Sequence, residues 1–447
     1  MKVRLSDHFT FKKIFKLTLA PMLMLLFTSF YSIVDGIFIA NYSSSSAFAG
    51  VNLIFPIIMI VGGIGFMIGT GGSALVGKLL GQKKEEEAKK TFTMIILFTL
   101  IIGVIFSFLG TILIEPITRG MASFSIDTTE DMIKEAIKYG SILMPAQVLF
   151  MFQSVYSSFF VVDEKPHLGF IFTLGAGLTN IVLDILFVGV FKLEIVGAAI
   201  ATICGYMVAS IGPTIYFFTH KNDYISFRKT KLEIKPLLQS CFNGSSEFVN
   251  NISTSIVSIV FNIQLLKFFG EAGVNAYGII MYLSFVFTSI FLGYSGGISP
   301  AVSYHFGAEN KEELSNILKK SLIIVSIFSL CMFGISFGLA NVFATLFSNG
   351  DTNLITITTN GLRIYAIAFL FIGLSIFISS YFTALNNGLI SALISFLRTL
   401  VFQIAFVFIF PLLLGKYGIF WAIFGSEVVS ILLAAFFLLK FRKRYGY

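Results

Sequence analysis

Long apolar runs alternate with short polar stretches along the whole of this 447-residue chain. The runs are about 20 residues or longer, the length that a helix needs to cross a hydrocarbon layer of ~30 Å. Lipid offers no partner for a free backbone N–H or C=O, so we expect the runs to be helical. The pattern predicts twelve membrane-spanning helices, at residues 14–40, 47–77, 91–115, 133–160, 167–190, 194–219, 236–268, 274–304, 315–346, 355–383, 388–414 and 416–441.

The polar stretches between the runs carry basic residues unevenly. If the chain begins in the cytoplasm, 23 of its 31 Lys and Arg lie on the cytoplasmic side, seven lie outside and one, Arg398, lies within a predicted helix. Cytoplasmic loops of membrane proteins are enriched in Lys and Arg. We therefore expect a multi-pass protein of the cell membrane with both termini in the cytoplasm.

The two halves of the chain resemble each other. Residues 81–88 read GQKKEEEA and residues 307–314 read GAENKEEL, an offset of 226. An even number of spans in each repeat gives both halves the same orientation, so an axis along the membrane normal should relate them, with a cavity between. The sequence predicts an all-helical membrane protein of two six-helix bundles, at 1–219 and 236–447, joined by a cytoplasmic linker at 220–235.

Glycines gather in two places, at 62–72 and 293–297. Small residues let membrane helices approach closely, and glycine also permits a helix to bend. We expect both segments to serve close packing or bending.

Composition and the lack of certain motifs argue against several classes of function. Hydrophobic residues make up 56% of the chain and charged residues 12%, about half the charged share of a soluble protein. The net charge of +8 is explained by the loops, so no nucleic-acid partner is expected. The three cysteines and four histidines show no metal-binding or disulfide spacing. No HExxH or GxSxG motif occurs, and we expect neither an enzyme nor a bound cofactor.

Polar residues of the first half lie at membrane depth, where an ionisable side chain costs roughly 2.5–3.5 kcal/mol. Asp35 lies in the first predicted span and Asp184 in the fifth, with Asn180 one turn before it on the same face. Thr202 lies in the sixth. At about 1.5 Å per residue, all four fall in one layer, ~7 to ~15 Å below the outer ends of their helices.

These four side chains offer hard oxygen donors, which suit an alkali cation or a proton. Two neighbouring carboxylates in a medium of low dielectric constant should retain at least one proton near neutral pH. The predicted role is therefore cation coupling, by H⁺ or by Na⁺, and Na⁺ would be held by Asp35, Asn180 and Asp184.

The second half lacks this set. At the repeat offsets, the four positions are occupied by Phe261, Phe402, Phe406 and Ile423. Acids kept in one half alone favour a functional role. The structural alternative, in which Asp35 is an interfacial residue and Asp184 caps a polar core pair, stays open.

The second half has buried charges of its own. Glu247, Arg398 and Glu427 each lie ~15–17 Å from a span end. Arg398 and Glu427 are on consecutive helices, so we expect a structural ion pair between them. Glu247, with Asn251 one turn later, is then left as an unpaired acid, which would contact a cationic substrate or form a second cation site.

One further residue, Pro21, shares a face of the first helix with Asp35 and permits a kink there. The two parallel halves, Pro21 and Asp35 in the first span, and Asn180-x-x-x-Asp184 in the fifth resemble the multidrug and toxic compound extrusion family, in the prokaryotic branch of the DinF-type and MepA-type exporters. The resemblance covers essentially the whole chain. It implies that Asp35, Asn180, Asp184 and Thr202 bind the coupling cation, that the first helix bends at Pro21 during transport, and that Na⁺ or H⁺ is exchanged for organic cations.

The expected function is cation-coupled multidrug efflux by alternating access, carried out by a monomer in the lipid bilayer. The coupling ion stays open because Na⁺ and H⁺ favour the same oxygens. An alternative within the same superfamily is a flippase for lipid-linked oligosaccharides. A flippase cavity should be rich in Arg and Lys to hold pyrophosphate, and Arg398 alone lies deep in this chain.

Overall fold

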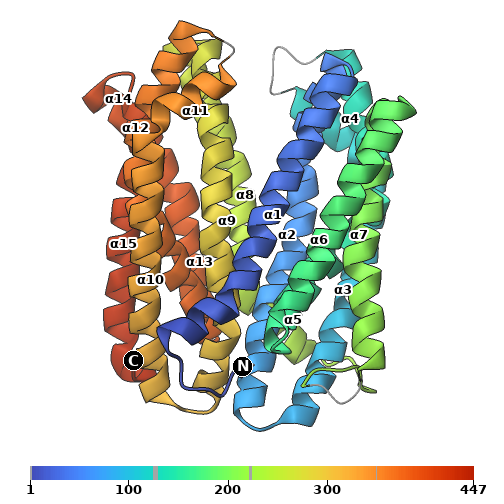
Figure 1. Cartoon of the computed structure of the whole chain (residues 1–447), viewed down its shortest axis with the longest axis vertical. Helices are drawn as coiled ribbons and strands as arrows, with labels where there is room; N and C mark the ends of the chain where they lie inside the picture. The colour runs from blue at the N-terminus through green and yellow to red at the C-terminus, as the bar shows by residue number, and fades with distance from the viewer. Residues whose placement is uncertain (1–2, 124–128, 221–223, 349) are drawn as a thin grey trace.

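The computed structural model describes residues 3–123, 129–220, 224–348 and 350–447, apart from the side chains of residues 37, 40, 41 and 45. Every regular element within these residues is a helix (Figure 1). Twelve of the resulting spans are long and apolar enough to cross a membrane. The predicted fold class is confirmed.

Within the described residues, the first bundle, here the N lobe, contains nine helical segments. One predicted span, 133–160, is interrupted by a 3₁₀ turn at Pro145, which has no N–H to donate to the helix. The segments are α1 (Phe11–Tyr42), α2 (Ser45–Gly81), α3 (Glu85–Ala122), α4 (Glu130–Leu143), η1 (Met144–Ala146), α5 (Gln147–Val162), α6 (Pro166–Asp184), η2 (Ile185–Val190) and α7 (Glu194–Thr219).

Among its described residues, the second bundle, here the C lobe, also contains nine helical segments. The helix expected over 315–346 ends early, at Gly338, because glycine is a poor helix former, and the short helix α11 follows. The segments are α8 (Ile234–Phe269), α9 (Glu271–Gly307), α10 (Lys311–Gly338), α11 (Ala340–Phe347), α12 (Thr352–Ala384), α13 (Gly388–Phe396), η3 (Leu397–Phe402), α14 (Gln403–Leu414) and α15 (Gly418–Tyr445).

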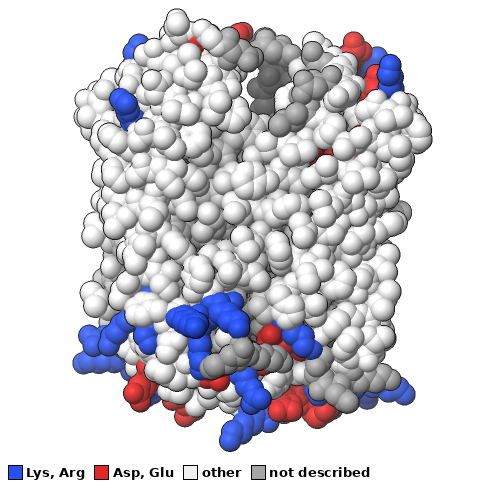
Figure 2. All heavy atoms as spheres, viewed as in Figure 1, with Lys and Arg blue, Asp and Glu red and all other residues white. Residues whose placement is uncertain are grey.

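Both chain termini lie at one end of the molecule, and the ribbons of the two lobes converge toward that end and separate toward the other (Figure 1). On the face shown in Figure 2, Lys and Arg gather at the end that carries the termini, and the middle of the face is almost bare of charge. A band without charged side chains is what a hydrocarbon layer requires.

Glycines seat the two lobes against each other. A Cβ at Gly71 of α2 would collide with the Ser240 carbonyl oxygen of α8. Nearer the termini, a Cβ at Gly81 would collide with the Tyr304 carbonyl, and one at Gly307 would collide with the Lys78 carbonyl. The second and third of these contacts are related by the offset of 226. The expected close packing at glycines is thus present, and it follows the internal repeat.

The segment before α1 joins the C lobe. The side chain of Phe9 is fully buried within the C-lobe core, and its ring meets the edge of His305. The Phe9 N–H donates to Glu313 Oε1 at 2.8 Å, and the Leu5 N–H donates to Glu164 Oε1 of the N lobe at 2.7 Å. The start of the chain is therefore bonded to both lobes.

Candidate cation-binding site

Helix α1 passes from the C lobe to the N lobe along its length. Near its start, Thr18 and Pro21 pack against Gly297 of α9, and farther on Phe27 and Tyr31 pack against Gly177 of α6. Proline lacks an N–H, so one carbonyl of the preceding turn loses its regular donor and the helix can bend there. The predicted bend residue lies where α1 leaves one lobe for the other. That the helix bends during transport stays a prediction.

The four polar residues predicted from the N-terminal half come together inside the N lobe. Asp184 is fully buried and Asn180 nearly so. Asp35 of α1 is close enough to interact with both. The Asn180 amide donates a long hydrogen bond, 3.5 Å, to the Thr202 hydroxyl. Helices α1, α6 and α7 thus bring two carboxyl groups, an amide and a hydroxyl to one place.

Four acceptor oxygens of this group have no donor among the described residues. Asp35 Oδ1, both carboxyl oxygens of Asp184 and Asn180 Oδ1 are buried, and no described residue donates a hydrogen bond to them. Buried polar atoms are usually paired, because an unpaired one has lost its hydrogen bonds to water without replacement. A set of unpaired acceptors facing one spot is instead matched by a proton or a small cation.

The donor set also indicates which kind of ion would fit. Two carboxyl groups with amide and hydroxyl oxygens are hard ligands, of the kind that alkali and proton-coupled sites use. Within the described parts of the chain, no three His, Cys, Asp or Glu side chains gather as a transition metal would need.

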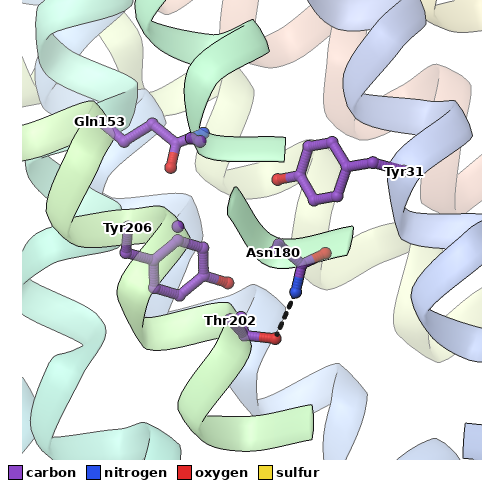
Figure 3. Close-up of a pocket in the computed structure, with 7 residues that line it drawn as sticks. Tyr31, Gln153, Asn180, Thr202 and Tyr206 are labelled. Carbon is purple, nitrogen blue, oxygen red and sulfur yellow. Dashed lines mark hydrogen bonds between the residues drawn. The ribbon is translucent and has the colours of Figure 1, made fainter. Parts of the chain in front are cut away.

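Sequence reasoning missed several residues that border the site. Figure 3 shows Tyr31, Gln153 and Tyr206 around the same small cavity as Asn180 and Thr202. Position gave one usable signal, since Tyr31 lies one helical turn before Asp35. Gln153 gave another, as an amide within an apolar run. The tyrosine of α7, Tyr206, carried no sequence signal that separates it from the other aromatic residues.

The C lobe contains the expected ion pair. Arg398 Nε donates to the two carboxylate oxygens of Glu427 at 2.8 and 3.1 Å. Their side chains are 9% and 1% exposed, so the pair is buried. The structure does not bring these residues to the Asp35 group, which lies in the other lobe.

Glu247 is the remaining buried acid of the C lobe. No described residue forms a hydrogen bond or an ion pair with its carboxylate, although Arg398 is close enough to act on it electrostatically. One turn later, Asn251 donates to the Glu247 backbone carbonyl at 2.8 Å and packs against Gly63 of α2. This part of α8 therefore faces the N lobe.

Comparison with known proteins decides the family. The family model MatE matches residues 21–186 and 248–409, which together make up more than half of the chain. The chain belongs to the MatE family. The two matched ranges begin 227 residues apart, in agreement with the internal repeat, and within this MatE protein they include Pro21, Asp35, Asn180, Asp184 and Arg398.

Relatives of this MatE protein match along almost its whole length. The Multidrug export protein MepA of Staphylococcus saprophyticus subsp. saprophyticus is 26% identical over 445 residues, which cover 97% of this chain and 94% of that protein. A crystal structure of MATE in complex with MaL6 superimposes with a TM-score of 0.91 at 21% identity, covering 98% of this chain and 97% of that one. An outward-facing conformation of a multidrug resistance MATE family transporter of the MOP superfamily also gives 0.91 at 21% identity, covering 100% and 98%. These structures share the fold.

Proposed function

We propose that this MatE protein exports organic, mostly cationic amphipathic compounds from the cell in exchange for H⁺ or Na⁺, by alternating access. The observation that carries the proposal is the set of buried, unpaired acceptor oxygens on Asp35, Asn180 and Asp184. The multidrug export named for its MepA relative supports the class of cargo.

The orientation follows from the basic residues. With the positively charged end in the cytoplasm, both termini are cytoplasmic and the glycine-packed contacts between the lobes close the cytoplasmic side. The cation enters the N lobe from outside, and its inward movement drives the cargo outward.

Helix α1 is the part that couples the two movements. It carries Asp35 into the N lobe, while its first turns pack on α9 of the C lobe. A proton or Na⁺ bound by Asp35 and Asp184 neutralises charge that two close carboxylates cannot both hold. Cation binding holds the Asp35 end of α1 more tightly in the N lobe. This end then shifts relative to the start of the helix, and α1 bends at Pro21.

Cargo would bind between the lobes. Glu247 supplies a negative charge on the part of α8 that faces the N lobe, where Asn251 packs against Gly63. In the flippase alternative, by contrast, the cavity must hold a pyrophosphate, and the charge of Arg398 is already balanced by Glu427. The buried pair thus favours export of cations over flipping of lipid-linked sugars.

The test is ethidium efflux from vesicles, with the Na⁺ gradient and the pH gradient imposed separately. We expect one gradient alone to drive efflux by the wild type and to name the coupling ion. Asp35→Asn and Asp184→Asn should each abolish driven efflux while the protein stays folded. Asp131→Asn is the matched control, since its side chain is 78% exposed on α4. Wild-type efflux by both inner variants would contradict the proposed mechanism.

A further inference from the structure

A second cavity lies beside the first in the N lobe. The first contains Asn180 and Thr202, and the second is lined by Ser157 and Thr173. Each cavity has room for about one water molecule. One side chain, Gln153, lines both of them. Two small spaces, each bordered by a few polar side chains, therefore share the single amide of Gln153, and the first borders Asn180 and Thr202 of the acid group.

Gln153 is poorly satisfied by the protein. The residue is 9% exposed, and its Oε1 is buried without a donor from any described residue. Figure 3 shows its amide end directed toward the Tyr31 hydroxyl and the space above Asn180 and Thr202. A buried amide oxygen without a donor has the same unmet need as the carboxylates, namely a cation or a water.

Helix α6 connects the two levels along one buried face. This face carries Thr173, Asn180 and Asp184, with small residues between them at Gly169, Ala176 and Gly177. Thr173 and Asn180 are seven residues apart, about two turns or ~10 Å. Polar groups therefore follow one another along the helix, from the acids toward the end that carries the termini.

Helix α7 adds a backbone oxygen at the lower level. Ala209 and Pro213 both line the second cavity. Because Pro213 has no N–H, the Ala209 carbonyl loses the donor that a regular helix would give it. A carbonyl, an amide oxygen and hydroxyls are hard, uncharged ligands, which hold a monovalent cation weakly because they supply no formal charge.

Aromatic rings close the second cavity on the side of the termini. Phe160 and Phe172 line it, with ring centroids 5.6 Å apart, and Phe160 also packs on Tyr216 at 5.5 Å. The second cavity thus borders the first at Gln153 and is bounded on the side of the termini by aromatic side chains.

We propose that Gln153, placed between the two cavities with an unpaired amide oxygen, forms a second and weaker binding position through which the coupling cation leaves the Asp35–Asp184 pair toward the cytoplasm. The ligand is a small monovalent cation, either H⁺ carried on a single water or Na⁺ held directly by protein oxygens. This inference rests on the proposed function.

The test uses Gln153→Met, which keeps the length and shape of the side chain but removes the amide. Gln147→Met is the matched control, because Gln147 lies in the same helix, is fully buried and also lacks partners among the described residues, yet lines neither cavity. Gln153→Asn, which retains an amide, keeps the test valid if the Met variant fails to fold.

Two rates are measured with purified protein in liposomes. One is the uptake of tetraphenylphosphonium driven by the gradient that drives the wild type, and the other is exchange of labelled for unlabelled tetraphenylphosphonium without a gradient. Because Met has no amide oxygen to bind the departing cation, Gln153→Met should lower the maximal driven rate about tenfold. Its exchange rate and the cation concentration for half-maximal rate should stay within about twofold of wild type. Gln153→Asn should lie between.

Three outcomes would overturn the proposal of a second cation-binding position at Gln153. These are an unchanged driven rate in Gln153→Met, an equal loss of driven transport and exchange, and an equal loss in Gln147→Met. A wild-type protein that shows no gradient-driven transport would instead overturn the proposed function itself, so the two failures are distinguishable.

Discussion

The interiors of the two lobes bury charge in opposite ways. In the N lobe, Asp35 Oδ1 and both carboxyl oxygens of Asp184 have no donors among the described residues. In the C lobe, Arg398 and Glu427 satisfy each other at 2.8 Å. Both sets adjoin a π turn, since Asp184 directly precedes η2 and Arg398 lies within η3. A similar local distortion thus serves a group that needs a ligand in one lobe and a group that needs none in the other.

This difference teaches how a buried charge can be interpreted. Insertion of either set into a membrane is costly, so cost alone does not separate function from structure. Whether the charge has a hydrogen-bonded partner does separate them, because a paired charge is explained by its partner and an unpaired charge is not. Variants in each lobe test this difference between unpaired and paired buried charges.

The largest effect is expected in the C lobe. Arg398→Met leaves the carboxylate of Glu427 buried without its partner, which should destabilise the protein by about 3–5 kcal/mol. Thermal unfolding in detergent measures this. The double variant Arg398→Met/Glu427→Leu should recover most of the loss, because a buried pair replaced by apolar residues is close to neutral. If the double variant is no more stable than the single one, the pair is more than structural.

In the N lobe, removal of a buried charged group should raise the stability of the protein instead of lowering it. Asp184→Leu removes a buried carboxyl group that lacks donors, so we expect the cation-free protein to gain about 1–2 kcal/mol, within the usual cost of an unsatisfied group. The coupling cation should raise the unfolding temperature of the wild type, because it binds the folded state alone, and should leave that of the variant unchanged. A clear loss of stability in Asp184→Leu would mean that the acid holds the fold together.

The smallest effect concerns hydroxyls in the C lobe. Ser391 shares hydrogen bonds of 3.0 Å with Ser379 and 2.7 Å with Thr383. Ser391→Ala should cost about 1 kcal/mol and leave driven transport unchanged. In contrast to Gln153, all three hydroxyls are buried against one another. A transport defect at wild-type stability would place this cluster on a functional path and remove the contrast between the lobes.

Much of the fold could be predicted from the sequence. Span length and loop charge identify the twelve helices because the membrane imposes both. The sequence repeat near Gly81 and Gly307 correctly predicted that the two lobes are related by symmetry, because the same glycine contact occurs twice. The breaks at Pro145 and Gly338 have apolar residues on both sides, and hydrophobic pattern alone does not register them.

The candidate site could be predicted in part. Asp35 and Asp184 are conspicuous because charge is rare at membrane depth, and their common layer follows from counting residues. Tyr206 and Gln153 were missed because neither is charged, and their roles depend on which helix faces which. The pairing of Arg398 with Glu427 was predictable from neighbouring spans, and so was Glu247 as the remaining unpaired acid. The contact of the neighbouring Asn251 with Gly63 of the N lobe needed the structure.

The bonds of the first residues also have a consequence for biosynthesis. Phe9 is bonded to Glu313, 304 positions later in the chain. When the ribosome has made the first helix, its partners α9 and α10 do not yet exist, and more than two-thirds of the 447 residues must be translated before Glu313 leaves the exit tunnel. Contacts of such long range form late. The earliest segment to enter the membrane is therefore among the last to find its place, and until then α1 must rest in lipid or against the newly inserted N lobe.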